Sequence, residues 1–291
     1  MKSEKGFVHL LIICEIVILI VVVILGVVKQ FGKTDEPVDY QANSQKIETE
    51  SEEHRQIPPA TETETETESE VEVEEDIVFS EEVTTLLESM TLEQKVAQLF
   101  VVTPETLTNT ERVTIAGRGT RTALTNYPVG GMLYARANYQ GSIQMNNLVN
   151  GAQEISYEVS GQYLFAATLV ETETGSALAV SSTNDAEALI ELIISDGDLS
   201  RLEDGAVELM PLLTQENITG EATEDLHCIM VQNVEEATQA LQNGAELLCI
   251  TEDFESIYSA VLEAINEGTI DAERIEQAVG LILTKKLAMI A

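Results

Sequence analysis

The feature that most constrains this chain is an apolar run of 22 residues from Phe7 to Val28. It is rich in Ile, Val and Leu, and only His9 and Glu15 are strongly polar. At 1.5 Å per residue, a helix of this length crosses a hydrocarbon core of roughly 30 Å. A cleaved signal peptide would have a shorter apolar stretch, of about 7 to 15 residues, ending in small residues. The run therefore predicts an uncleaved transmembrane anchor at residues 7–28, after a short head at residues 1–6.

The charges around this run do not fix its orientation. Lys2 and Lys5 precede it, and Lys29 and Lys33 follow it, so the positive-inside rule gives nearly equal counts. A head of six residues is too short to fold, and every folded part of the chain must follow the span. We expect a single-pass protein of a bacterial cell membrane, with a signal anchor in the lipid bilayer and its domain outside the cell.

Composition excludes some classes of function. The net charge is −36, opposite in sign to the basic surface of a nucleic-acid-binding protein, so we expect no nucleic-acid partner. The three cysteines, Cys14, Cys228 and Cys249, form no disulfide framework and no metal-binding spacing. Cys228 and Cys249 lie inside apolar runs, which indicates buried packing. We therefore expect no metal and no cofactor.

Residues 29–79 show almost no apolar periodicity. Residues 61–68 repeat Thr-Glu four times, and more glutamates follow. A segment of low hydrophobicity and one dense sign of charge does not bury enough surface to offset its ordering entropy. The alternation of Val71 and Val73 with Glu also suits a strand, although carboxylates at every other position would repel across a sheet. We expect residues 29–79 to be a disordered acidic linker.

From Ser80 to the end, helical and strand patterns alternate, which indicates a parallel α/β domain at residues 80–291. Six short buried strands are predicted, at Phe100–Val102, Val129–Tyr134, Tyr163–Val170, Val207–Leu213, Cys228–Val231 and Leu247–Ile250. Helices are predicted at Glu82–Ser89, Leu92–Leu99, Thr110–Asn126, Ile143–Ser156, Asp185–Ile194, Glu235–Asn243, Phe254–Glu267 and Ala272–Lys286. A full (β/α)₈ barrel takes about 250 residues, so the pattern predicts an incomplete or reduced TIM-type barrel of about six parallel strands.

Three blocks carry a resemblance to a known family. They are MTLEQKVAQLFVVTPETL at 90–107, TIAGRGTRTALTNYPVGGMLYARANYQ at 114–140 and GAELLCITEDFESIYSAVLEAINEGTIDAERIEQAVGLILTKK at 244–286. Together they resemble glycoside hydrolase family 3, most closely its bacterial β-N-acetylhexosaminidase branch. The middle of the chain is similar only in fragments, such as DGAVELMPLLTQENITGEAT at 204–223. The resemblance implies an N-terminal TIM-type barrel whose YPVGG strand ends at the sugar-binding mouth, with Asn138 facing that mouth.

The resemblance also implies catalytic groups that this chain lacks. The family places an aspartate nucleophile at the end of an ITD strand, and HCIMVQN places Gln232 at that position. An amide is no nucleophile, and it stabilises an oxocarbenium ion far less than a carboxylate would. The family's K-H-F-P-G-H-G motif is absent. VETETGSALAV at 170–180 replaces the family's sugar loop, and only Glu171, Glu173 and Gly175 match residues of that loop. Glu171 and Asn138 are the candidate substrate-binding residues.

Other carboxylates lie near predicted strand ends. Glu173 and Glu252 are weak candidates for a rebuilt catalytic pair, but Glu252 and Asp253 also suit capping of the helix that begins at Phe254. His227, the one histidine after residue 79, precedes a strand and is better explained as a strand-edge residue than as a catalytic base. Whether the chain is an enzyme stays open at this point, and the missing groups favour a protein without activity.

Three functions remain. The first is a membrane-anchored, inactive relative of glycoside hydrolase family 3 that binds or scaffolds at the cell envelope, with a glycan or peptidoglycan fragment as ligand. The second is an active β-N-acetylhexosaminidase that removes terminal N-acetylglucosamine from cell-wall or other glycans. The third is a degenerate chain with no ligand site. An incomplete barrel would also leave open strand edges, so we expect either a smaller closed sheet or a protein partner, including a homodimer.

Overall fold

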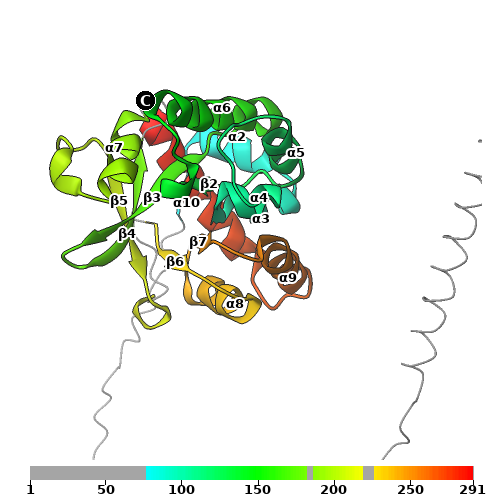
Figure 1. The fold of residues 1–291 in the computed structure, drawn as a ribbon. Helices are drawn as coiled ribbons and strands as arrows, with labels where there is room; N and C mark the ends of the chain where they lie inside the picture. The colour runs from blue at the N-terminus through cyan, green and yellow to red at the C-terminus, as the bar shows by residue number, and fades with distance from the viewer. Residues whose placement is uncertain (1–76, 182–185, 219–225, 291) are drawn as a thin grey trace, which may run out of the picture. The chain divides into compact units, whose positions relative to one another are not determined.

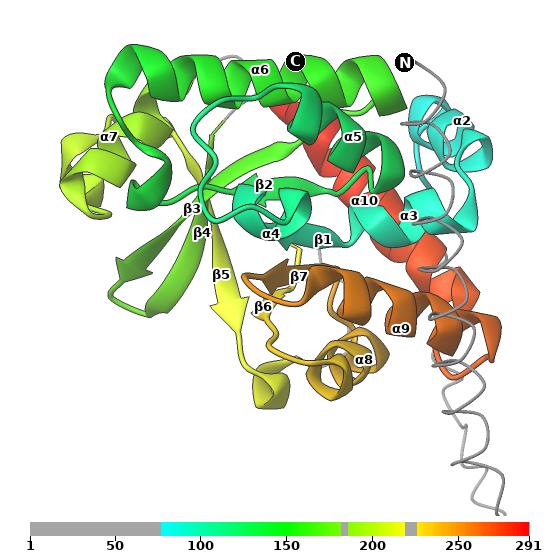
Figure 2. The ribbon, with the colours of Figure 1, turned by 45° about the vertical axis from the view of Figure 1, so that its right-hand side comes forward.

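The computed structural model describes residues 77–181, 186–218 and 226–290, all within one compact unit at residues 71–291. The anchor expected at residues 7–28, and the linker expected at 29–79 up to residue 76, lie outside the described residues. Within the described ranges, no helix is long and apolar enough to cross a bilayer. Figures 1 and 2 show this part of the chain as a sheet surrounded by helices.

The sheet is a closed barrel of seven strands in chain order. The ring closes where β1 pairs with β7 in parallel, with Val101 opposite Cys249. The strands are β1 (Phe100–Val102), β2 (Gly131–Leu133), β3 (Phe165–Thr172), β4 (Gly175–Ser181), β5 (Glu208–Leu213), β6 (Cys228–Met230) and β7 (Leu247–Ile250). All six predicted strands are present, with bounds that shift by a few residues. The described chain therefore closes its own sheet.

The prediction of an incomplete, all-parallel barrel is wrong, because the barrel contains one strand that was not predicted, β4. It runs antiparallel to both β3 and β5, and joins β3 through a tight hairpin at residues 173–174. Gly175 has φ +131°, a conformation that favours glycine, and the Thr172 hydroxyl donates to the Gly175 carbonyl at 2.7 Å. The segment interpreted as the remains of a sugar loop is thus a strand. The open edges expected from six strands are absent from the described residues.

Both faces of β4 are buried, which explains why it holds its place in the barrel. Leu178 and Val180 join the main core, whereas Ala177 and Ala179 pack with Leu192 of α7 in a second, smaller cluster outside the barrel. A strand covered on both faces shows a continuous apolar run rather than alternation. This pattern is present in the sequence ALAV at 177–180.

The helices cover the outside of the barrel (Figure 1). They are α2 (Glu81–Ser89), α3 (Leu92–Gln98), α4 (Pro104–Thr108), α5 (Arg118–Asn126), α6 (Ser142–Ser160), α7 (Glu187–Ser195), α8 (Val234–Asn243), α9 (Phe254–Asn266) and α10 (Ala272–Ile290), with short 3₁₀ turns η1 (Arg136–Asn138), η2 (Leu199–Arg201) and η3 (Gln215–Asn217). Thr91 is the N-cap of α3: its hydroxyl accepts from the Gln94 amide, and the Gln94 side chain accepts from the Thr91 amide.

One helix prediction is wrong in part. Residues 110–117, predicted as the start of a helix from Thr110 to Asn126, form a loop, and α5 begins at Arg118. Tertiary hydrogen bonds hold this loop. The Val113 amide donates to Glu105, and the Thr114 carbonyl accepts from Gln144. These bonds, made to residues distant in sequence, outweigh the local helical preference of the segment.

The amino-terminal end of the barrel is closed by a buried polar pair. Lys286, in the last turns of α10, is 3% exposed, and its ammonium donates to Gln98 Oε1 at 2.7 Å and lies 5.2 Å from the centre of the Phe165 ring. Gln98 precedes β1 and donates in turn to the Pro128 carbonyl, at 2.6 Å. Burial lowers the pKa of Lys286 to about 7.

Candidate functional site

The carboxyl ends of the six parallel strands meet at one end of the barrel. In barrels of this kind, ligand-binding residues gather at that end because the loops there vary without disturbing the core. The residues that follow these strands are Thr103 after β1, Tyr134 after β2, the β3–β4 hairpin, Thr214 after β5, Val231 after β6 and Thr251 after β7. The sequence candidates Gln232, Asn138, Glu171, Glu173 and Glu252 all lie on these connections.

Gln232 lies two residues after β6 and is exposed. Its backbone amide donates to Glu236 Oε2 at 2.8 Å, and the next residue, Asn233, caps α8 by accepting from the Glu236 amide at 3.0 Å. In the part of the chain that the structure describes, the Gln232 side chain has no hydrogen-bond partner. The side-chain amide of Gln232 is therefore uncharged and free of hydrogen bonds within the described part of the chain. It lies at the position where the family resemblance implies a nucleophile.

Asn138, in the loop after β2, is buried and does not face the solvent. It is 1% exposed, and its Nδ2 donates to Glu105 Oε1 at 2.7 Å and to the Val113 carbonyl at 2.9 Å. Its Oδ1 accepts from the Ala135 amide at 2.9 Å. The amide therefore joins the loops that follow β1 and β2, and its substrate-binding role stays a prediction. Glu105 is a structural carboxylate for the same reason.

Glu171 and Glu173 lie on the β3–β4 hairpin, whose end projects from the body of the domain (Figures 1 and 2). Both are exposed. Glu171 lies opposite Ser176 in the antiparallel pair, and the Ser176 hydroxyl donates to Glu171 Oε1 at 2.8 Å. Because Glu171 and Glu173 stand on the exposed hairpin and its turn, neither carboxylate has the buried setting typical of a catalytic acid.

Glu252 and Asp253 follow β7 and line an open cavity of about 440 Å³ together with Thr106, Asn109 and the first turn of α9. Asp253 is the N-cap residue of α9, as the sequence indicates, but it has a left-handed backbone with φ +55°. Its carboxylate accepts from the Ser256 hydroxyl at 2.7 Å instead of from a backbone amide. Both carboxylates are exposed. This is the one described cavity where sequence candidates line a pocket at the carboxyl end of the strands.

The best-connected carboxylate lies at the other end of the barrel, and the sequence analysis missed it. Glu246 directly precedes β7, its side chain is 3% exposed, and it accepts from Arg274 at 2.6 Å and from the backbone amide of His227 at 2.8 Å. His227 Nδ1 lies 3.1 Å from the same carboxylate. His227 is therefore the strand-edge residue that the sequence indicates. The available signal for this network was a single Glu directly before the apolar run LLCI at 247–250.

Within the described residues, neither the cysteine thiols nor the possible metal ligands add a further catalytic group. Burial raises the pKa of Cys249 to about 12 and raises that of Cys228 as well, so both thiols stay protonated. Among the described residues, no group of His, Cys, Asp and Glu side chains is placed to hold a metal ion. The absence of a metal site in the protein stays a prediction from the sequence.

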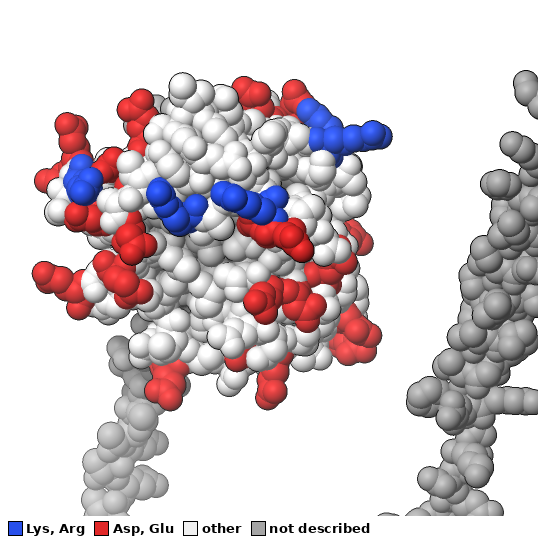
Figure 3. Space-filling view, in the orientation of Figure 1, with Lys and Arg blue, Asp and Glu red and all other residues white. Residues whose placement is uncertain are grey.

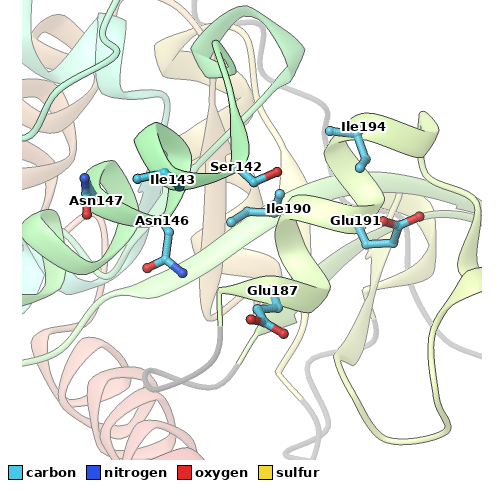
Figure 4. A pocket seen from close by; sticks show the side chains of 8 residues that line it. All are labelled: Ser142, Ile143, Asn146, Asn147, Glu187, Ile190, Glu191 and Ile194. Carbon is cyan, nitrogen blue, oxygen red and sulfur yellow. The ribbon is translucent and has the colours of Figure 1, made fainter.

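A further cavity lies outside the barrel, between α6 and α7, with a volume of about 460 Å³ (Figure 4). Three isoleucines, Ile143, Ile190 and Ile194, supply its apolar lining, and Asn146 and Glu191 are among its polar residues. Ile143 is 82% exposed, and Ile194 is 39% exposed. The cavity has a mixed apolar and polar lining and no aromatic side chain, so it lacks the stacking surface common in sugar sites.

Comparison with solved structures finds enzymes of similar fold. A β-N-acetylglucosaminidase from Paenibacillus sp. str. FPU-7 aligns over 69% of this chain and 63% of its own, with 15% identity and a TM-score of 0.44. A fungal multi-domain β-N-acetylglucosaminidase aligns over 69% of this chain and 40% of its own, with 12% identity and a TM-score of 0.43. Both are glycoside hydrolase family 3 enzymes.

An exo-1,3/1,4-β-glucanase from a Pseudoalteromonas species is also similar, over 73% of this chain and 56% of its own, with 11% identity and a TM-score of 0.41. The aligned part thus spans less than two thirds of each of these three chains. No protein-family model matches the sequence, and no curated protein matches it.

Proposed function

We propose that this chain is a membrane-anchored, glycoside hydrolase family 3-like protein without glycosidase activity, which acts at the cell envelope as a binding or scaffolding module. The observation that carries this proposal is the exposed amide of Gln232 at the carboxyl end of β6. A retaining glycosidase needs a carboxylate there to bond to the anomeric carbon, and an acid to protonate the leaving oxygen. Among the described carboxylates at the carboxyl end of the strands, none is buried.

The remaining parts of the proposal come from the sequence. Residues 7–28 would anchor the chain in the bilayer, and the acidic linker would hold the domain outside the cell, within reach of the wall. A glycan or a peptidoglycan fragment is the proposed ligand, because the family that the sequence blocks resemble acts on glycans. Sedimentation of the full chain with purified peptidoglycan tests this ligand, and equal recovery without peptidoglycan would exclude it.

The loss of activity is tested with two substrates. We expect the full chain to release no nitrophenol from 4-nitrophenyl N-acetyl-β-glucosaminide. We also expect no release from the 2,4-dinitrophenyl glycoside, whose leaving group departs without an acid. Gln232→Asp should then give a single release of dinitrophenolate per chain as the new carboxylate bonds to the anomeric carbon. No release by this variant would show that residue 232 is not the seat of the nucleophile.

An active β-N-acetylhexosaminidase is the second candidate, and the cavity beside Glu252 and Asp253 favours it. Turnover by the unmodified chain that is lost in Glu252→Gln or Glu173→Gln would establish this enzyme and refute the inactive module. Glu255→Gln is the matched control, because Glu255 lines the same cavity but begins α9. If Glu255→Gln lowers the rate as much as Glu252→Gln does, the loss reflects the cavity's charge rather than a catalytic group.

A further inference from the structure

One segment of this acidic chain has no acidic residue at all. Between Glu111 and Glu154 there are four arginines and no Asp or Glu, in a chain with 51 acidic and 15 basic residues. The segment contains the loop after β1, α5, β2, η1 and the first half of α6. It therefore forms a region of positive charge on a molecule whose net charge is −36.

The arginines of this segment also lack counter-ions. Arg121 pairs with Glu158, but Arg112, Arg118 and Arg136 have no carboxylate partner in the described ranges. Arg112 Nε donates to the Ala137 carbonyl at 2.7 Å. The other described basic residues are paired with carboxylates, apart from the buried Lys286: these are Lys95, Arg201, Arg274 and Lys285. The uncompensated positive charge thus lies on this segment.

Hydrogen bonds join the two loops of the segment into one surface. Besides the bond from Arg112 to Ala137, Gln144 Nε2 donates to the Thr114 carbonyl at 2.6 Å, and Asn138 Nδ2 donates to the Val113 carbonyl. The Arg136 guanidinium lies 4.7 Å from the centre of the Tyr139 ring, which holds it in place. The loop after β1 and the loop after β2 therefore present their side chains together.

The loop after β1 and the start of α6 carry two of the most exposed apolar side chains of the described chain. Ile115 is 75% exposed, and Ile143 is 82% exposed. Exposed aliphatic groups among unpaired arginines suit a partner that offers both anionic groups and an apolar phase, which is the surface of a bilayer with anionic lipids. A soluble polyanion offers the charge without the apolar phase. The isoleucines therefore favour the lipid surface.

We propose that Arg112, Arg118, Arg136, Ile115 and Ile143, here called the loop surface, dock the domain on an anionic bilayer. The proposal rests on the membrane anchoring proposed above, because an anchor keeps the domain close enough to the bilayer for weak contacts to hold. The rest of the molecule is acidic and is repelled by anionic lipids, so charge also orients the loop surface toward the bilayer. In Figure 3, Asp and Glu side chains lie around the outline of the face shown, at its top and sides as well as at its lower edge, and the Lys and Arg side chains of this face lie in its upper half.

The test places a polarity-sensitive fluorophore on the loop surface of the full chain. Ile115→Cys is labelled in a Cys14→Ser background, because the two remaining cysteines, Cys228 and Cys249, are buried. The chain is incorporated into vesicles of phosphatidylcholine alone or of phosphatidylcholine mixed with anionic phosphatidylglycerol. We expect a blue shift of emission only with phosphatidylglycerol, and we expect salt to reverse it. A label at Val234→Cys, at the start of α8, should show no shift.

Charge variants decide whether the arginines cause the shift. At a contribution typical of a surface arginine, Arg112→Gln with Arg136→Gln should weaken the lipid interaction roughly 30-fold, and Arg118→Gln alone roughly 5-fold. Arg118 is exposed, and no hydrogen bond from its side chain is seen among the described residues, so its substitution leaves the loops intact. Arg201→Gln is the matched control, because Arg201 is paired with Glu191 and Asp198 outside the loop surface.

The outcomes separate this proposal from the anchoring on which it rests. A chain that fails to float with phosphatidylcholine vesicles refutes the anchor, and adding phosphatidylglycerol vesicles to the same labelled chain still tests the loop surface. Equal emission with the two lipid mixtures overturns the docking proposal. A shift produced by soluble polyphosphate in the absence of phosphatidylglycerol also overturns it, and identifies a soluble polyanion as the partner.

Discussion

Replacing Lys286 with methionine should stabilise the protein at neutral pH and lose that advantage at alkaline pH. Lys286 is buried at the amino-terminal end of the barrel, and burial lowers its pKa from 10.5 to about 7. The unfolded chain therefore binds more protons than the folded protein between pH 7 and 10.5, and the free energy of unfolding rises with pH across this window. At 1.36 kcal/mol per pKa unit, the buried charge costs roughly 5 kcal/mol at and below pH 7.

The gain from Lys286→Met is smaller than this cost, because Gln98 Oε1 loses its partner. An unsatisfied buried acceptor costs about 1–3 kcal/mol, so we expect a net stabilisation of about 2–4 kcal/mol at pH 7. Near pH 10.5 the buried Lys286 amine is neutral and its charge no longer lowers the free energy of unfolding. The variant should then be as stable as the unmodified protein or less stable. The difference between the two proteins is the measured quantity, so groups that titrate in both cancel.

Urea unfolding measures this difference at several pH values between 7 and 10.5. The chain has no tryptophan, so far-UV circular dichroism is the signal, for the full chain and for residues 71–291. Lys285→Met is the matched control, because the neighbouring Lys285 pairs with Glu208 and remains partly exposed, so its effect should be small and nearly independent of pH. A Lys286→Met effect that does not change with pH would refute a neutral buried amine.

Three further changes test the structural assignments of the barrel. Glu246→Gln should lower the free energy of unfolding by about 1–3 kcal/mol, because the buried side chain loses its charged hydrogen bond with Arg274, which is itself partly exposed. Glu276→Gln, which breaks a more exposed ion pair, should cost less than about 1 kcal/mol in the same denaturation assay. Gly130→Ala would place a Cβ 2.0 Å from the Gln98 carbonyl and should lower the melting temperature sharply. Gly119→Ala has open space in α5 and should raise the free energy of unfolding by about 0.5–1 kcal/mol. Asn138→Ala should cost about 1–3 kcal/mol through its lost loop hydrogen bonds, and a variant that loses peptidoglycan binding at unchanged stability would instead support a ligand contact.

The strands of this fold were predictable where both of their faces are buried. Short apolar runs such as LLCI at 247–250 point to parallel strands, because covered strands need no polar alternation. The strand β4 was missed although ALAV at 177–180 has the same character. Its tight turn matched the position of a family loop, and a reversal of strand direction leaves no mark on an apolar run. The turn residue Gly175 was the signal that separates a hairpin from a loop.

The candidate site was less predictable than the fold. Gln232 lies two residues after β6 and is exposed, and its assignment to the position of the nucleophile stays a prediction from the alignment of one strand. The family resemblance implied that Asn138 faces the mouth, but the hydrogen bonds of Asn138 depend on the path of the loop at residues 110–117. That path is set by bonds to residues distant in sequence, such as Gln144, which no local pattern reveals.

The pairing of β1 with β7 has a consequence for how the chain folds. The β3–β4 hairpin joins residues that are near in sequence, so it can form within microseconds. Phe100, in contrast, meets Leu248, and this contact of high sequence separation must wait until most of the chain has been ordered. During synthesis β1 leaves the ribosome long before β7, so the edge of β1 that pairs with β7 stays unpaired meanwhile. We expect premature termination before Leu247 to yield an aggregating product rather than a smaller working domain.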